Sequence, residues 1–233
     1  MRFATPPVPG TLIRRYQRFL ADVRLADGRE VVAHVANSGA MTACSAPGSP
    51  CFVTPAAGAR RRLAWTLEIV VEGGVPVGVN TARANALAEE ALRLGVVRLP
   101  DSTGPWSLRR EVRLAAGTRI DFLVEDGRGP MWIEVKSVSW AEDGVALFPD
   151  AVSARAARHL AELEARVQGG ERAALLYLVQ RGDARAVRAA AAVDPAYVAA
   201  LAAARRAGVV VRAVQVAVAP GGLVPWRELP VLP

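Results

Sequence analysis

Three charged residues interrupt two otherwise apolar stretches in the middle of the chain. Asp121 lies within residues 118–124, and Glu134 and Lys136 lie within residues 131–136. Both stretches have the composition of buried β-strands, where a charge is costly unless it is paired or bound to a metal ion. These three side chains are therefore the first candidates for a functional site.

Strand geometry predicts that the three side chains meet. Side chains alternate between the two faces of a strand, so Glu134 and Lys136 point to the same face. Residues 125–130 contain Asp-Gly-Arg-Gly-Pro, a turn composition, and a hairpin symmetric about residues 127–128 places Asp121 opposite Glu134. Opposed residues on one face have Cβ atoms about 4.5–5.5 Å apart. A slip of one residue in the register would separate them.

Two carboxylates beside an ammonium group suit metal-dependent hydrolysis of phosphodiesters. Mg²⁺, or Mn²⁺ in its place, binds one or two carboxylates together with water and phosphate oxygens. Such an ion neutralises charge on the phosphate and helps to form an attacking hydroxide. Lys136 would orient or deprotonate the water, and Glu111 on the preceding strand is a fourth catalytic candidate. The alternative is a partly buried cluster of ion pairs that only stabilises a sheet.

The composition of the basic residues singles out Lys136. Among 29 basic residues, Lys136 is the only lysine. A guanidinium group does not lose its proton, whereas an ammonium group is compact and can titrate. A single lysine in an arginine-rich chain therefore indicates a position where an arginine would not serve.

The net charge of +7 favours a polyanionic partner such as nucleic acid. Residues 1–72 carry nine arginines against five acidic residues. Arg155 and His159 share a helix face and form a second basic group. The alternative for these arginines is an ordinary solvated surface without a partner. The alternative for His34 is a buried position in the core. The candidates for contact with nucleic acid are Arg14, Arg15, Arg18, His34, Arg60, Arg61, Arg62, Arg155 and His159.

Other classes of protein are disfavoured. The apolar runs are shorter than the roughly 20 residues that span a bilayer, and the first residues lack the apolar core of a signal peptide. A cytoplasmic protein that does not contact membranes is therefore expected. Cys44 and Cys51 do not have the number or spacing of a structural zinc site, and inert thiols are favoured over a disulfide.

The pattern of apolar residues predicts two domains of an α/β (α+β) protein. Residues 1–75 indicate a small OB-like β-barrel that binds nucleic acid, and Gly73-Gly74 marks the boundary to an α/β domain over residues 76–233. Barrel strands are expected over residues 12–25, 30–35, 51–54 and 63–71, with a loop over residues 37–50.

In the second domain the predicted order is α-β-β-β-α-β-α-β. The last strand–helix–strand unit implies a right-handed parallel crossover. Asp150 or Ser153 is expected to cap the second helix, and Asp194-Pro195 to open the third. The predicted elements are a helix over 82–94, strands over 108–114, 119–124 and 131–139, a helix ending near 167, a strand over 173–180, a helix from 195, and a final strand over 209–218.

Several segments together resemble the sugar fermentation stimulation protein A (SfsA) family. These segments are residues 12–23 (LIRRYQRFLADV), His34 with 37–41 (NSGAM), 78–81 (GVNT), 119–123 (RIDFL), 134–138 (EVKSV), 148–152 (FPDAV), and Arg155 with His159-Leu160.

The resemblance implies an N-terminal OB-like domain and a C-terminal PD-(D/E)XK nuclease-like domain, a mixed sheet with flanking helices. It also implies DNA binding and a role in regulating sugar-metabolism genes. The family's acidic and lysine positions correspond to Asp121, Glu134 and Lys136, with Glu111 as a further one. A cysteine that the family has after its histidine is replaced here by Val35, and a later glycine and lysine are replaced by Ala156 and Arg158.

The main hypothesis is a nuclease-type protein whose barrel binds double-stranded DNA and whose second domain binds Mg²⁺. The alternative is a non-catalytic DNA-binding transcriptional regulator that retains a nuclease fold. A small-molecule enzyme is a third reading, but no glycine-rich nucleotide-binding motif supports it. The oligomeric state is not readable from the sequence.

Overall fold

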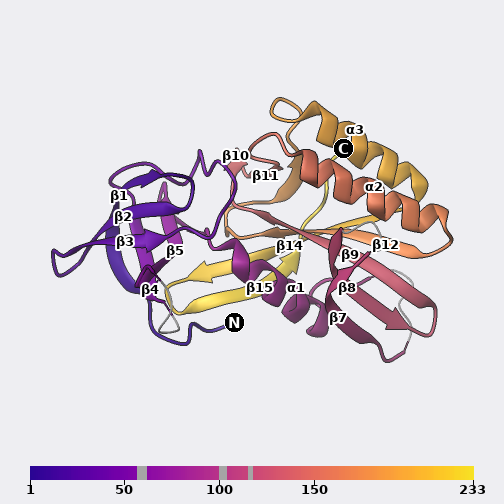
Figure 1. The fold of residues 1–233 in the computed structure, drawn as a ribbon, viewed down its shortest axis with the longest axis horizontal. Coiled ribbons are helices and arrows are strands. Elements are labelled where there is room, and N and C mark those ends of the chain that lie inside the picture. Colours follow the sequence, from indigo (N-terminus) through magenta and orange to yellow (C-terminus); the bar gives the residue numbers. More distant parts are fainter. Residues whose placement is uncertain (57–61, 100–103, 115–117) are drawn as a thin grey trace.

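Alternating buried and exposed residues organise the first part of the chain into a six-stranded sheet. The computed structural model describes residues 1–56, 62–99, 104–114 and 118–233, arranged as two lobes side by side (Figure 1). A parallel pairing of β3 with β5 closes five of the strands into a barrel, which confirms the OB-like domain. The strands of the first lobe are β1 (Val8–Tyr16), β2 (Leu20–Leu25), β3 (Glu30–His34), β4 (Pro50–Pro55), β5 (Trp65–Glu72) and β6 (Val75–Gly78).

Two turns in this lobe differ from the sequence-based expectation. Residues 12–25 form two strands, because Gln17 and Arg18 adopt left-handed φ angles of 47° and 63° and reverse the chain. Neither residue is the glycine or asparagine that signals such a hairpin turn. Gly73 and Gly74, with φ angles of 54° and 84°, also form a hairpin turn. The expected domain boundary therefore falls inside the β5–β6 hairpin, and the first sheet continues to Gly78.

The second lobe is built on a mixed six-stranded sheet in the order β15-β14-β12-β9-β8-β7. Strand β12 is parallel to both β9 and β14, which confirms the predicted crossover, and the outer pairs are antiparallel. Its main strands are β7 (Ser107–Arg113), β8 (Arg119–Asp126), β9 (Gly129–Val138), β12 (Arg172–Val179), β14 (Val210–Ala219) and β15 (Gly222–Glu228).

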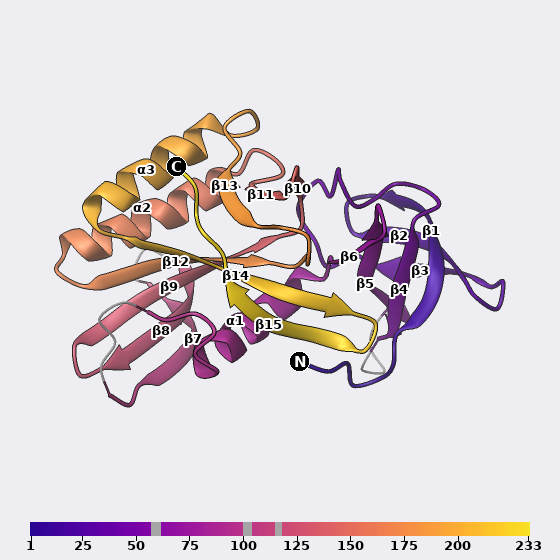
Figure 2. The ribbon, with the colours of Figure 1, turned by 180° about the vertical axis from the view of Figure 1, so that it is seen from behind.

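Helices cover both faces of this sheet (Figure 2). Helix α1 (Ala84–Arg93), after the short helix η1 (Thr81–Arg83), packs on one face through Leu87 and Ala91, which contact a cluster that includes Phe122 and Ile133. Helices α2 (Ala154–Gln168) and α3 (Pro195–Ala207) pack on the other face. This arrangement is the mixed sheet with flanking helices that was expected.

Four strands of this lobe were not predicted. Strands β10 (Ala141–Glu142), β11 (Val145–Phe148) and β13 (Ala186–Ala189) form a separate small sheet. Strand β15 follows β14, so the segment 209–218 is not the final strand. Pro225 lies within β15, and a proline argues against a central strand but is compatible with this edge position.

The helix caps follow the predicted chemistry with one exception. Asp194 accepts hydrogen bonds from the backbone N of Tyr197 at 2.9 Å and of Ser153 at 2.8 Å, so it caps α3 and also holds the start of α2. Ser153 caps α2 by accepting from Ala156 N at 3.2 Å. Asp150 is not a helix cap, because it accepts from the backbone N of Met41 in the first lobe at 3.0 Å. None of the described helices combines the length and apolarity that crossing a bilayer requires.

The two cysteines provide a test of the barrel core. Cys44 and Cys51 are buried free thiols, and burial raises the pKa of each to about 12. Because the thiolate is the reactive form, we expect neither to react with Ellman's reagent at pH 8 in the folded protein. Both should react in guanidinium chloride. Rapid labelling of either thiol under native conditions would contradict the packing described here.

Candidate active site

The pairing of β8 with β9 brings the predicted site residues together. Phe122 is paired with Ile133 and Val124 with Met131. These pairs have the register that the hairpin argument predicted. The pairing ends at Phe122, and the side chain of Asp121 accepts from the backbone N of Val135 at 2.8 Å, next to Glu134. Lys136 lies on the same face as Glu134, and its Nζ donates to Glu134 Oε1 at 2.6 Å. The three side chains therefore share one site at the middle of the sheet.

Glu134 is the most constrained member of the site. The residue is 3% exposed, and its Oε1 also contacts His159 Nδ1 from α2. Its Oε2 is buried and has no hydrogen-bond partner among the described residues. Burial alone would raise the pKa of Glu134, but the hydrogen bond from His159 and the charge of Lys136 outweigh it and lower the pKa. The carboxylate is thus held ionised with one oxygen left open.

Asp121 has less compensation for its charge than Glu134 has. Its carboxylate accepts from the backbone N of Val135 at 2.8 Å and from Asn85 Nδ2 at 2.9 Å. Burial, followed by the negative charge of Glu134, raises the pKa of Asp121 despite these hydrogen bonds. Within the pair, Glu134 is compensated by Lys136 and His159, whereas the charge of Asp121 is the one that a bound cation would compensate.

Glu111 stands at the rim of the site rather than inside it. It is exposed, and its Oε1 accepts from Asn85 Nδ2 at 3.2 Å while Arg119 Nε lies 2.6 Å from its Oε2. Its φ angle of 57° is in the left-handed region, which residues other than glycine rarely adopt and which is enriched at functional sites. Asn85 thus links Glu111 to Asp121.

Both lobes match models of one protein family. The description "SfsA N-terminal OB domain" matches residues 13–79, and "Sugar fermentation stimulation protein RE domain" matches residues 82–222. The chain belongs to the SfsA family.

Relatives and a solved structure agree with this assignment. Sugar fermentation stimulation protein homologs are 48% identical in Paramagnetospirillum magneticum, over 96% of this chain and 94% of the relative, and 47% identical in Thioalkalivibrio sulfidiphilus, over 99% and 98%. The structure of Pyrococcus furiosus SfsA in complex with Ca²⁺ has a TM-score of 0.89 and 26% identity, and the match covers 100% of this chain and 98% of that one.

Asp121 and Glu134 are the residues that would hold a divalent cation in this SfsA family member. Within the part of the chain that the structure describes, no group of three histidine, cysteine or acidic side chains gathers as a ready-made ligand set. Asp121 and Glu134 would supply two carboxylates, and the open Oε2 of Glu134 is the atom that needs a partner. Mg²⁺ commonly keeps water and phosphate oxygens as its other ligands, so two carboxylates suffice.

Two residues of the site were misjudged or missed from the sequence. His159 was expected to contact nucleic acid together with Arg155; it is 4% exposed and contacts Glu134 and Lys136. Arg155 itself is exposed, and its Nε lies 3.4 Å from His159 Nε2. Asn85 was missed because a polar residue in the first turn of an amphipathic helix looks like an ordinary solvent-facing residue.

The basic residues of the barrel are not brought to the carboxylates. Arg14 is exposed and paired with Asp22 at 2.7 Å. Arg15 donates to the backbone carbonyls of Arg18, Asn37, Gly39 and Ala40, so its guanidinium group is engaged within the barrel. The remaining candidates divide by exposure: Arg18 and Arg62 are exposed, His34 is half-buried, and Arg60 and Arg61 lie outside the described residues.

The support that His159 gives to Glu134 can be tested without any metal ion. His159→Ala would leave the buried carboxylate with Lys136 as its one charged partner. We expect the free energy of unfolding to fall by about 2 kcal/mol, since a buried charged group then loses a hydrogen bond. Urea denaturation in EDTA measures this change. Arg158→Ala, an exposed neighbour on the same helix, is the control, and an equal effect of both substitutions would contradict the assignment.

Proposed function

We propose that this SfsA family member binds DNA and hydrolyses phosphodiester bonds with Mg²⁺ or Mn²⁺ held by Asp121 and Glu134. The observation that carries the proposal is the state of Glu134. Its Oε1 is occupied by Lys136 and His159, and its buried Oε2 has no partner among the described side chains. A protein that needed only a structural ion pair would satisfy both oxygens, because an unsatisfied buried polar atom is costly.

Each residue of the site has a separate task in this proposal. A bound divalent ion would neutralise phosphate charge and activate water. Asp121 and Glu134 would hold the ion, while Asn85 and His159 fix the two carboxylates by hydrogen bonds. As the ammonium group paired with Glu134, Lys136 would orient the attacking water or stabilise negative charge that develops on the phosphate. Glu111 would act from the rim through Asn85.

Two further observations support the proposal. The related Pyrococcus protein was solved in complex with Ca²⁺, a hard cation that prefers oxygen ligands as Mg²⁺ does. The net charge of +7 favours a polyanion such as DNA. A role in the regulation of sugar metabolism is part of the proposal and would act through binding or cutting DNA.

A second candidate function is a DNA-binding transcriptional regulator that retains the nuclease fold without turnover. The ion pair of Lys136 with Glu134 favours it, because this pair already compensates part of the buried charge. DNA binding that persists in EDTA, without cleavage under any metal condition, would support this candidate.

Cleavage of DNA tests the first candidate. Purified protein should nick plasmid and cut labelled oligonucleotides in Mg²⁺ or Mn²⁺ but not in EDTA. Lys136→Ala and Glu134→Gln should each lower the rate by about 100-fold or more, as expected for groups that act in the transition state. Lys136→Arg should also be impaired, because a planar guanidinium group does not match the compact ammonium group that donates to Glu134.

The control for cleavage is an exposed basic residue outside the site. Arg188→Ala removes one positive charge from an exposed position on β13 and should leave the rate within twofold. Cleavage that copurifies equally with the Lys136→Ala and wild-type proteins would come from a contaminant, and the proposed activity would then be rejected.

Binding of the metal ion can be measured apart from catalysis. A ligand that binds only the folded state stabilises it, by about 2.7 kcal/mol at a concentration 100 times its Kd. We expect Mn²⁺ to raise the Tm of the wild-type protein and to have little effect on Asp121→Asn or Glu134→Gln. An equal rise in all three proteins would place the ion elsewhere.

A further inference from the structure

We propose that Phe19 at the tip of the β1–β2 hairpin stacks on an unpaired base, so that the DNA entering the site is single-stranded there. This inference rests on the proposed function and narrows its substrate from DNA in general to a single-stranded segment. It also departs from the double-stranded DNA that the sequence suggested.

Phe19 is an exposed aromatic side chain on a well-anchored backbone. Its exposed fraction is 45%, although the rest of the hairpin belongs to a closed barrel. Phe19 N donates to Gln17 O at 2.7 Å, and Phe19 O accepts from Val35 N at 2.8 Å. The ring is therefore presented to solvent on fixed backbone, next to the exposed Arg18.

A segment of the barrel joins this hairpin to the entrances of both helices that carry site residues. Arg15 donates to the carbonyl of Arg18 and to carbonyls within residues 37–40. The same segment, residues 35–41, bonds to Thr81 ahead of α1 and to Asp150 ahead of α2. The hairpin tip is thus connected, through this segment, to the residues that precede the two helices of the site.

Gly39 lies directly against the carboxylate of Asp150. A Cβ atom added at Gly39 would lie 2.5 and 2.6 Å from the carboxylate oxygens of Asp150, so a side chain at this position would displace the carboxylate that holds Met41. The distance from the α2 cap to the site is also short. Ser153 and His159 are six residues apart, which is about 9 Å along a helix.

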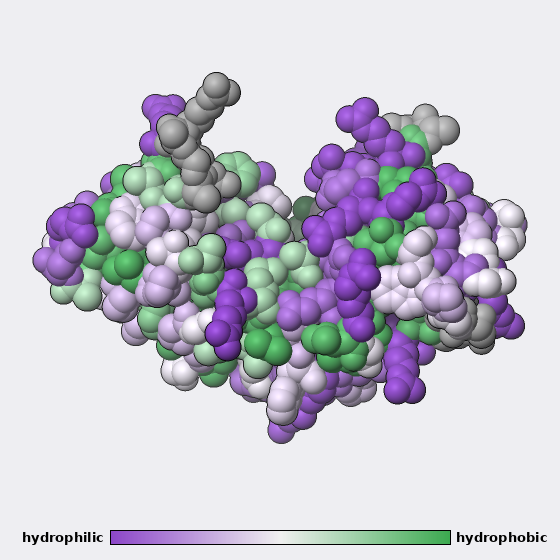
Figure 3. Space-filling view, turned by 90° about the horizontal axis from the view of Figure 1, so that it is seen from below, coloured by the Kyte–Doolittle hydropathy of each residue, from purple (hydrophilic) through white to green (hydrophobic). Residues whose placement is uncertain are grey.

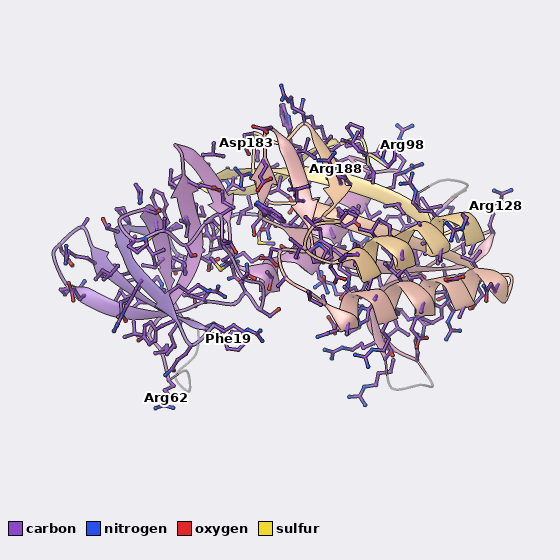
Figure 4. The ribbon with its side chains drawn as sticks, turned by 90° about the horizontal axis from the view of Figure 1, so that it is seen from above. Phe19, Arg62, Arg98, Arg128, Asp183 and Arg188 are labelled. Atoms are coloured by element: carbon purple, nitrogen blue, oxygen red, sulfur yellow. The ribbon has the colours of Figure 1, made fainter. Side chains whose placement is uncertain are left out.

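The β1–β2 hairpin lies on the side of the barrel next to the hollow between the two lobes. Figure 3 shows the surface hollowed between the lobes, with hydrophilic residues on the wall of the second lobe. Figure 4 shows Phe19 on the side of the barrel that faces α2, and Arg62 on the same side. Arg62 lies between β4 and β5, and in OB-fold proteins the loops between β1 and β2 and between β4 and β5 border the nucleic-acid site.

An exposed aromatic ring discriminates between single-stranded and double-stranded DNA. In a duplex the bases stack on each other and offer no free face, whereas an unpaired base can stack on a protein ring. Arginines such as Arg18 and Arg62 would contact phosphates in either form, so they contribute to affinity without this discrimination. The combination of one ring and flanking guanidinium groups is typical of proteins that bind single strands.

The test compares binding of a 20-nucleotide single strand and of the matching blunt duplex by fluorescence anisotropy in EDTA, where no cleavage occurs. The wild-type protein should prefer the single strand. Phe19→Ala should weaken binding of the single strand by about tenfold and binding of the duplex by less than twofold, and Phe19→Trp should restore the preference. Trp226→Ala, at a 65% exposed aromatic residue on β15, three strands from β9, is the matched control and should change neither affinity.

The outcomes separate this inference from the proposed function. If Phe19→Ala leaves the single-strand affinity unchanged, or weakens both substrates equally, the stacking role is overturned and Phe19 belongs to another contact, such as a protein partner. Cleavage by the wild-type protein in Mn²⁺ would still stand in that case. If the wild-type protein binds single strands through Phe19 but never cuts DNA, the nuclease proposal fails and the stacking role stands.

Discussion

The arrangement of the second lobe depends on how the negative charge of one buried carboxylate is compensated. Glu134 lies in the middle of β9 at 3% exposure, and an ionised carboxylate cannot be held there without charged or hydrogen-bonding partners. Lys136 supplies one partner from the same strand, and His159 supplies another from α2. The packing of α2 against the sheet is therefore tied to the chemistry of the site, since any shift of this helix would remove His159 from Glu134.

The barrel is fixed to this lobe by charged contacts instead of a continuous apolar core. Arg83 next to α1 donates to both oxygens of Glu68 on β5, each at 2.6 Å. Arg181 after β12 donates to Glu72 on β5 at 2.9 Å. Together with the contact of Asp150 with Met41, these bonds set the position of the β1–β2 hairpin relative to the carboxylates. Hydrogen bonds and ion pairs are directional, so they define the orientation of the two lobes more closely than apolar contacts alone would.

The core of the candidate site could be predicted from the sequence because it depends on local geometry. Alternation along β9 fixes the shared face of Glu134 and Lys136, and the length of a short hairpin fixes which residue of β8 lies opposite Glu134. The capping of α3 by Asp194 and the crossover from β12 to β14 were predictable for the same reason. Each follows from contacts within a few residues or from the handedness of a single connection.

The parts that depended on distant segments could not be predicted. His159 and Asn85 look like ordinary polar residues of amphipathic helices, and only the packing of α2 and α1 on opposite faces of the sheet brings them to the two carboxylates. By residue type, Arg15 suggests a phosphate contact and Asp150 suggests a helix cap. In the structure both form hydrogen bonds to the segment 35–41. The sequence by itself determined the chemistry of the site, since residue type and strand period belong to single elements. The tertiary structure alone decided which side chains support that chemistry, because a free carbonyl or carboxylate finds its partner only when separate elements pack together.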